Sequence, residues 1–327
     1  TLFRSGDTII LCLIIQFLFH AFLKVELMEL SQTISNLIFE IQKLTQAVEK
    51  ISKTQEISID VLDEAIAFRW ERENNKGSLV AIRKPQLISF NHLCNIDSQL
   101  TKVKLNTEAF AKGLLANNVL MTGSRGTGKS SIVKACLNEY HHLGLRVIEL
   151  EKKYLEDLPK IINLLQDRTE RFIIFCDDLA FEAGDSSYAT LKTVLDGSLA
   201  SSSDNTLIYA TSNRKHMVAE YNKDNTELNV GENGELRPGD SIEQKISLAD
   251  RFGLQINFYG FSQQEYLKTV QYWLNEYKWQ QRETWETIQL KAIQYATQQG
   301  NRSGRIANQF AKMIVGQEML SAADLTV

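Results

Sequence analysis

The chain has 327 residues, of which 43% are hydrophobic and 23% are charged, which is typical of a globular protein with a sizeable core and one smaller unit. A formal net charge of −4 excludes an overall basic footprint for nucleic acid, so such binding would need a local basic patch. The four cysteines are far apart and form no Cys-x-x-Cys pair, which argues against a disulfide scaffold or a zinc site and indicates a reduced, cytoplasmic protein.

The first predicted element is a doubtful apolar leader within residues 1–27. Residues 9–23 are apolar apart from Gln16 and His20, and this stretch is short for a membrane span. The opening TLFRS is also what a common sequencing adaptor encodes when translated, and Met28 is the first methionine. We therefore expect residues 1–27 to be an artefact, with a genuine membrane anchor as the alternative.

Residues 28–72 are predicted to form an N-terminal helical segment. Its apolar positions recur at alternating spacings of four and three over about three heptads. The pattern predicts either a coiled coil for self-association or partner binding, or an amphipathic helix docked on its own domain, and the sequence leaves both open. Gly77 and Pro85 then mark a linker or an irregular entry into the next domain. The heptad positions are Leu30, Ile34, Leu37, Ile41, Leu44, Val48 and Ile51.

The centre of the chain alternates apolar strands with helical stretches, which predicts an α/β fold with a parallel sheet covered by helices on both faces. After Gly260 the pattern predicts three helices and no strand, so a small helical domain follows. The predicted boundaries are 85–260 for the sheet domain and 261–327 for the helical domain. The candidate strands are 118–122, 145–150, 172–176, 206–210 and 254–258, and the candidate helices between them are 129–142, 155–167 and 188–200.

The motif GSRGTGKS fits the phosphate-binding pattern G-x-x-x-x-G-K-[ST] and lies between a predicted strand and a predicted helix. Its glycines let backbone amides turn toward phosphate oxygens, and the helix N-terminus adds its dipole. Lys129 is expected to reach the β- and γ-phosphates of ATP, and the Ser130 hydroxyl to bind Mg²⁺. The residues predicted to bind the nucleotide are Gly123, Ser124, Arg125, Gly126, Thr127, Gly128, Lys129, Ser130 and Ser131.

Two adjacent aspartates follow the apolar strand FIIFC, and like charges at that place are costly unless a cation is near. In P-loop proteins a carboxylate here holds magnesium, so Asp177 is the expected metal residue. Asp178 is expected to orient the attacking water, with a cap on the following segment as the alternative. Asn213 ends another strand, and because parallel strands open onto one crevice, its amide is expected to hold that water unless it only forms a turn.

The order of these motifs resembles that of AAA+ ATPases. The segments NNVLMTGSRGTGKSSIVKA, RFIIFCDDLAFE, YATLKTVLDGS, IYATSNRKH, SLADRFGL and GNRSGRIANQF resemble more closely a bacterial AAA+ family catalogued as a domain of unknown function. The likeness runs from about Phe68 to Phe310. It implies a five-stranded AAA+ sheet, ATP with magnesium, and a helical lid. On the AAA+ pattern Asn213 matches sensor 1, Arg251 the arginine finger and Arg305 the sensor 2 arginine, with Arg302 as a rival for the last role.

Arg251 ends a helical stretch just before the last predicted strand, at a domain edge. From there its guanidinium can reach the γ-phosphate bound by a neighbouring subunit and offset charge in the transition state. The alternative is a surface arginine paired with Asp250. An arginine finger that acts on the nucleotide of a neighbouring subunit predicts a homo-oligomer. The predicted catalytic residues are Asp178, Asn213, Arg251 and Arg305.

The predicted function is an oligomeric AAA+ ATPase that couples ATP binding and hydrolysis to the remodelling of an unidentified partner. Many AAA+ motors carry Asp-Glu after the metal-binding strand, whereas helicase loaders and replication initiators often carry Asp-Asp, as this chain does. The pair therefore predicts, as the alternative, a slow-hydrolysing switch that recruits DNA or protein. A small-molecule kinase is disfavoured, because it does not explain a finger at the domain edge. Residues 218–244 form an acidic insertion, either a solvated loop or a partner loop.

Overall fold

The computed structural model divides into two compact units, Thr1–Ile57 and Ser58–Val327. Most of the predicted leader within residues 1–27 and most of the predicted insertion at residues 218–244 lie outside the described residues. Within the part of the chain that is described, no helix is long and apolar enough to cross a membrane. The structure describes residues 20, 24, 27–46, 60–74, 76–180, 186–197, 204–213, 229–230, 236–237 and 248–323.

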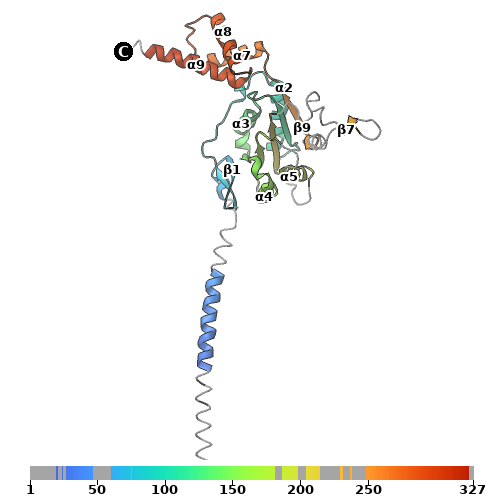
Figure 1. Cartoon of the computed structure of the whole chain (residues 1–327), viewed down its shortest axis with the longest axis vertical. Coiled ribbons are helices and arrows are strands. Elements are labelled where there is room, and N and C mark those ends of the chain that lie inside the picture. Colours follow the sequence, from blue (N-terminus) through green and yellow to red (C-terminus); the bar gives the residue numbers. More distant parts are fainter. Residues whose placement is uncertain are drawn as a thin grey trace, which may run out of the picture. The chain divides into compact units, whose positions relative to one another are not determined.

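The first unit contains a helix over residues 27–46, drawn in blue in Figure 1. Five of the predicted heptad positions lie on it, and the exposed fractions of these residues range from 49% at Ile34 to 65% at Leu44. Val48 and Ile51 lie outside the described residues. Residues 27–46 are therefore helical, whereas the predicted segment as a unit and the surface that covers its apolar positions stay predictions.

The second unit is built on a parallel sheet in which five strands take the order β4-β5-β6-β3-β9. Their residues are mostly apolar and buried, as expected for strands that are covered on both faces. The five predicted strands are confirmed, with ends shifted by at most two residues. They are β3 (Val119–Gly123), β4 (Leu145–Glu149), β5 (Arg171–Cys176), β6 (Thr206–Ser212) and β9 (Leu254–Phe258).

Two further strands extend this sheet to seven. β1 (Ala67–Glu73) and β2 (Lys76–Ala81) pair antiparallel, and β1 lies parallel to β4 at the edge of the sheet. This corrects the prediction that helical structure continues to residue 72 and that a linker follows. The remaining predicted division, into residues 85–260 and 261–327, stays a prediction, because Ser58–Val327 is one compact unit.

A buried polar contact shows why these residues form strands rather than a helix. Trp70 is fully buried, and its Nε1 donates a hydrogen bond of 3.0 Å to Oδ2 of Asp157. Arg72 binds both oxygens of the same carboxylate, at 3.0 and 2.7 Å. Trp70 and Arg72 lie two apart and so point to the same side of a strand. Their partner is more than 80 residues away, and no local pattern reveals it.

Alternating residues of the strands face two layers of helices. Ile173 and Phe175 belong to the core cluster that includes residues of α2 and α3, whereas the equally buried Phe172 and Ile174 do not and so face the other side. α4 and α5 contact each other apart from that cluster. The predicted cover on both faces is therefore confirmed. These helices are α2 (Asp97–Ala111), α3 (Lys129–Tyr140), α4 (Leu158–Leu165) and α5 (Ser186–Leu195).

Three helices follow the sheet, as predicted, and lie together in Figure 1. Ser262 starts the first of them with a capping box, since its side chain accepts from the backbone of Glu265 and the Glu265 side chain accepts in return. The buried Tyr266 donates a hydrogen bond of 3.1 Å to the Ala292 carbonyl and so ties the first helix to the second. The helices are α7 (Gln263–Glu276), α8 (Trp285–Gln298) and α9 (Gly304–Ala323).

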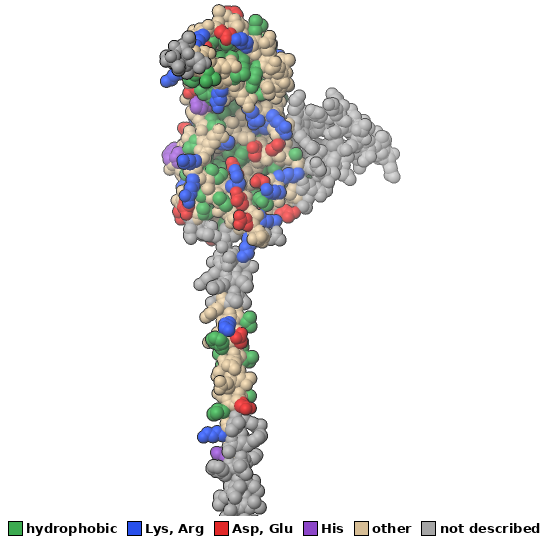
Figure 2. All heavy atoms as spheres, turned by 60° about the vertical axis from the view of Figure 1, so that its left-hand side comes forward, with side chains coloured by type: hydrophobic (Ala, Val, Ile, Leu, Met, Phe, Trp, Pro, Cys, Tyr) green, Lys and Arg blue, Asp and Glu red, His purple; other side chains and the backbone are tan. Residues whose placement is uncertain are grey.

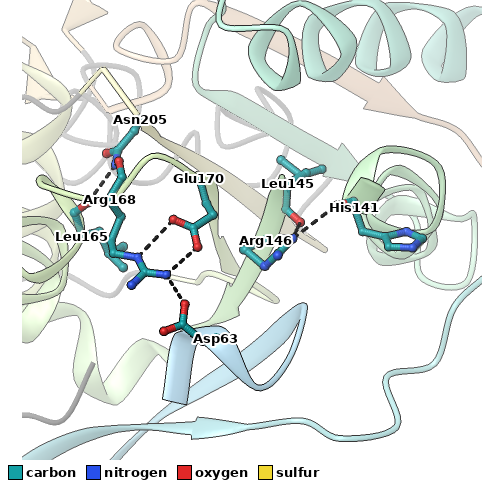
Figure 3. Close-up of polar contacts among 8 residues, drawn as sticks. All are labelled: Asp63, His141, Leu145, Arg146, Leu165, Arg168, Glu170 and Asn205. Atoms are coloured by element: carbon teal, nitrogen blue, oxygen red, sulfur yellow. Dashed lines mark hydrogen bonds and ion pairs between the residues drawn. The ribbon is translucent and has the colours of Figure 1, made fainter. Parts of the chain in front are cut away.

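A polar network braces the end of the sheet at which β5 and β6 begin (Figure 3). The Arg168 side chain binds both carboxylate oxygens of Glu170 and one oxygen of Asp63. Asn205 donates to the carbonyl oxygens of Leu165 and Arg168, at 2.7 and 2.9 Å. The residues of the predicted site follow β3, β5 and β6 and so lie at the opposite end of the sheet. The short elements are η1 (Asp60–Asp63), η2 (Phe90–His92), η3 (His141–Leu143), η4 (Lys152–Asp157), β7 (Asn229–Val230) and β8 (Leu236–Arg237).

Candidate nucleotide-binding site

The predicted phosphate loop joins the buried end of β3 to the start of α3. Gly123 has a φ of 126°, and a Cβ at this position would lie 1.9 Å from the Phe258 carbonyl oxygen. Gly126 has a φ of 76°, and a Cβ there would lie 2.7 Å from Oγ of Ser303, just before α9. Both positions therefore need glycine, and the course of the loop is set by β9 on one side and by the start of α9 on the other.

Lys129 is the first residue of α3 and is only 5% exposed. Its Nζ donates hydrogen bonds to the carbonyl oxygens of Gly123 and Ser124, at 2.8 and 2.7 Å, and to Oδ1 of Asn213 at 3.1 Å. Burial lowers the pKa of Lys129 to about 8, against the opposing effect of two nearby aspartates. An anionic ligand beside this ammonium would favour its charged form.

This lowered pKa predicts how the stability of the nucleotide-free protein depends on pH. From about pH 8 to about pH 10, we expect the parent to gain stability relative to Lys129→Met. The pKa of Lys129 is lower in the folded chain than in the unfolded chain, so the unfolded state binds more protons in this interval and stability rises with pH. Methionine keeps most of the side-chain volume and does not titrate. Urea unfolding of both proteins across the interval measures the difference, and a constant difference contradicts the lowered pKa.

Asp177 follows β5 and accepts two hydrogen bonds on Oδ1. One comes from the Ser130 hydroxyl at 2.7 Å, and the other comes from the Thr211 hydroxyl. The two predicted metal residues are thus in contact although they lie 47 positions apart. No group of three His, Cys, Asp or Glu side chains among the described residues could hold a metal ion. A cation at this pair would need further oxygens from water or phosphate, which is how magnesium is usually bound.

Asp178 and Asn213 are held together beside Lys129. Asp178 has a φ of 54°, which is uncommon for a residue with a side chain, and its N–H donates to the Thr211 hydroxyl at 2.8 Å. Asn213 donates from Nδ2 to Oδ1 of Asp178, and its own Oδ1 accepts from Lys129. The structure therefore brings together three side chains that follow three different strands. Their catalytic roles stay predictions.

A cavity of about 920 Å³ opens onto these residues, and the phosphate loop forms one of its walls. The opposite walls come from residues 86–96 and from α7 and α9. Trp273 stacks on Tyr277, with ring centroids 5.6 Å apart, and the rings of His92 and Tyr272 each lie 5.3 Å from it. No sequence pattern predicted this aromatic group. Trp273 and Tyr277, at the end of α7, lie four apart, a spacing that could have revealed the pair, but His92 carries no local signal.

The two candidate lid arginines, Arg302 and Arg305, lie in different places in the structure. Arg305 lies in the cavity wall near the start of α9, and its backbone N–H donates to the Gly126 carbonyl at 3.2 Å. Arg302 is exposed and outside the cavity wall, and its carbonyl oxygen accepts from the Phe261 N–H at 3.1 Å. Arg305 is therefore the lid arginine that faces the phosphate loop, and its role as a sensor stays a prediction.

Arg251 lies outside the described wall of this cavity. Its Nε binds the carboxylate of Asp196, which directly follows α5, and the alternative pairing with Asp250 stays a prediction. A role for Arg251 at the nucleotide of its own chain would require movement. A role at the nucleotide of a neighbouring chain stays a prediction.

The parallel strands have the order β4-β5-β6-β3-β9. The phosphate loop follows β3, acidic residues follow β5, an amide follows β6 and a helical C-terminal part meets the loop, which is the arrangement of the AAA+ fold. The chain belongs to the family described as "Protein of unknown function (DUF815)", which matches residues 63–318. The predicted resemblance to an AAA+ family of this kind is therefore confirmed.

No curated protein matches this chain. Among solved structures, a RuvB variant of Thermotoga maritima is 14% identical with a TM-score of 0.47, and the match covers 72% of this chain and 66% of that chain. PCH-2 of C. elegans is 16% identical with a TM-score of 0.43, and that match covers 70% of this chain and 71% of the other. The chain thus spans about two thirds of the RuvB chain. Similarities at this level of identity and TM-score do not establish an activity or a partner for this chain.

Proposed function

We propose that this protein binds ATP with magnesium in the cavity beside the phosphate loop, hydrolyses it, and uses the cycle to remodel a partner macromolecule. One observation carries the proposal. Lys129, Asn213 and Asp178 form a hydrogen-bonded chain along one cavity, and Ser130 with Asp177 lies beside it in the same wall. A cation, a hydroxyl–carboxylate pair and an amide at the ends of neighbouring strands are the groups that phosphoryl transfer needs.

The loop and the first turn of α3 fit the phosphates of a nucleotide. The N-cap of α3 is Gly128, which makes no side-chain cap, and the first turn contains no acidic residue. The N–H groups at this helix start are therefore available to an anion, and the helix dipole favours one. Lys129 would contact the β- and γ-phosphates, and Ser130 with Asp177 would hold the magnesium ion, which supplies charge neutralisation when bound.

Asp178 and Asn213 fit the orientation of a water molecule for attack on the terminal phosphate. The Asn213 amide binds Lys129 through its oxygen and Asp178 through its nitrogen, so it sets the distance between the phosphate-binding ammonium and the carboxylate. A carboxylate beside the terminal phosphate can accept a proton from the attacking water. Asp178 lies in the cavity wall and is more than half exposed, so such a water has access to it.

The far side of the cavity fits the nucleobase of ATP. Trp273, Tyr277 and His92 present ring faces or edges there, and flat aromatic groups stack on such side chains. Because these residues come from α7 and from the segment before α2, a bound nucleotide would connect the helical part of the domain to the sheet. Closure of the helical part on ATP would then transmit the nucleotide state to a partner.

A protein partner is favoured over an extended nucleic-acid groove. On the face shown in Figure 2, Lys and Arg side chains are interspersed with Asp and Glu rather than gathered into a basic surface. Continuous phosphate contacts would need such a surface. The alternative of a slow switch is supported by Asp178, since each of its two carboxylate oxygens has a protein neighbour, Asn213 or Arg125, that competes with water for it.

The proposal predicts different effects on binding and turnover when either of the two aspartates is substituted. Asp178→Asn should keep ATP affinity at least at the parent level and lower phosphate release by about 100-fold or more, because the proton acceptor is lost. Asp177→Ala should instead remove the dependence of binding on magnesium. Phosphate release and calorimetric binding, with and without magnesium, measure both effects. The control is Asp204→Asn, an exposed residue just before β6 at the opposite end of the sheet. Parent-like turnover by both site variants would refute the assignment.

A further inference from the structure

The phosphate loop carries a second cation besides Lys129. Arg125 lies between two of its glycines, and its Nη2 is 3.8 Å from Oδ2 of Asp178. The side chains of Arg125 and Asp178 are 72% and 54% exposed, and both line the cavity. An ion pair this long and this open to water is weak, so another anion can compete for the guanidinium.

Asp178 is held from three directions. Its N–H donates to Thr211, its Oδ1 accepts from Asn213, and its Oδ2 faces Arg125. A non-glycine residue with a φ of 54° is strained and persists where its surroundings fix it, as these contacts do. The carboxylate therefore has no oxygen in this structure that lacks a protein neighbour. The N–H contact leaves both carboxylate oxygens unaffected, so only the contacts of Oδ1 with Asn213 and of Oδ2 with Arg125 compete with an oriented water.

Arg125 is the contact that can be released. Thr211 and Asn213 belong to β6 or directly follow it, and Asn213 is also bound by Lys129. The Arg125 side chain, by contrast, has a flexible stem on an exposed loop and is in the same cavity wall as Lys129. The guanidinium is thus close to the place that phosphates of a nucleotide would occupy.

We propose that Arg125 is a positioning residue that distinguishes nucleoside triphosphate from diphosphate and controls Asp178. Without nucleotide Arg125 contacts Oδ2 of Asp178, and with a triphosphate its guanidinium moves to the terminal phosphate and leaves that oxygen to orient water. The inference rests on the proposed function of this site. Phosphate oxygens accept two parallel hydrogen bonds from a guanidinium and carry more charge than one carboxylate, which favours the transfer. A diphosphate has no group at this position, so Asp178 stays engaged.

The decisive measurement compares affinities for ADP and for a non-hydrolysable ATP analogue, both with magnesium. Arg125→Gln should weaken binding of the ATP analogue by about 10-fold or more, the usual effect of one charged hydrogen bond, and leave ADP binding within about twofold. Arg125→Lys should restore part of the difference. The matched control is Arg282→Gln, an exposed arginine outside the cavity wall. Equal losses for both nucleotides, or no loss for either, would overturn the inference.

A double-mutant cycle tests the contact with Asp178 without any turnover. Asp178→Asn should raise affinity for the ATP analogue by up to about fivefold, because the competing ion pair is lost, and it should have no such effect when Arg125 is already glutamine. Independent effects of the two substitutions would contradict the inference. Circular dichroism checks that each variant is folded. If the Arg125→Gln variant is unfolded, Arg125→Lys takes its place in the cycle. If the parent binds neither nucleotide, the proposed function itself has failed.

Discussion

Replacement of Lys129 by alanine should weaken ATP binding by about 100-fold or more, because the change removes charged hydrogen bonds to two phosphates, each worth about tenfold. The Nζ atom is already directed into the loop by the carbonyl oxygens of Gly123 and Ser124. The ammonium therefore loses little freedom when phosphate binds, although its phosphate contacts replace some of the three hydrogen bonds that it makes within the protein. Isothermal calorimetry with a non-hydrolysable ATP analogue measures the effect.

The control for this experiment is Lys112→Ala at the end of α2. Lys112 is exposed, pairs with Glu108 on its own helix, and is absent from the cavity wall. The Lys112→Ala variant should bind the nucleotide with the affinity of the parent. Unchanged affinity in Lys129→Ala, with a parent-like unfolding transition, would mean that the loop is not the phosphate site. Equal losses in both variants would point to general electrostatics rather than to a specific contact.

Replacement of Arg251 by alanine should spare ATP binding and lower the rate of hydrolysis by up to about 10³-fold, because a finger acts on charge in the transition state. Arg251 is outside the described wall of its own cavity and bound to Asp196, so we place its action on the nucleotide of a neighbouring chain. A mixture of Arg251→Ala with Lys129→Ala should then recover part of the activity. The first variant supplies a sound phosphate loop and the second supplies an intact finger.

The variant Asp196→Ala distinguishes two roles of Arg251, an arginine finger and a partner in a purely structural ion pair. If Arg251 only ties its chain to the end of α5, then the loss of Asp196 should lower the rate as much as the loss of Arg251. If Arg251 is a finger, Asp196→Ala should keep most of the activity, because only one anchoring contact is lost. Steady-state phosphate release across a range of protein concentrations measures each variant. No recovery in mixtures that are shown to co-assemble would place the action of Arg251 within its own chain.

The sequence by itself determined the parts of this protein that depend on neighbouring residues. In the phosphate loop, glycines that allow the turn, the lysine at the helix start and the adjacent hydroxyl all lie within eight consecutive residues, so backbone geometry alone places them. The five central strands are continuous apolar runs, which indicate burial on both faces wherever they occur. The capping box at Ser262 and the helix over residues 27–46 are likewise local.

Only the tertiary structure decided which distant side chains meet. The strands at residues 67–81 were missed because they are stabilised by Asp157, more than 80 residues away. The choice of Arg305 over Arg302 depends on where α9 meets the loop, and the aromatic wall depends on how α7 packs against residues 86–96. Such contacts arise from strand register and helix packing. Those are properties of the whole core, and no local spacing of residues encodes them.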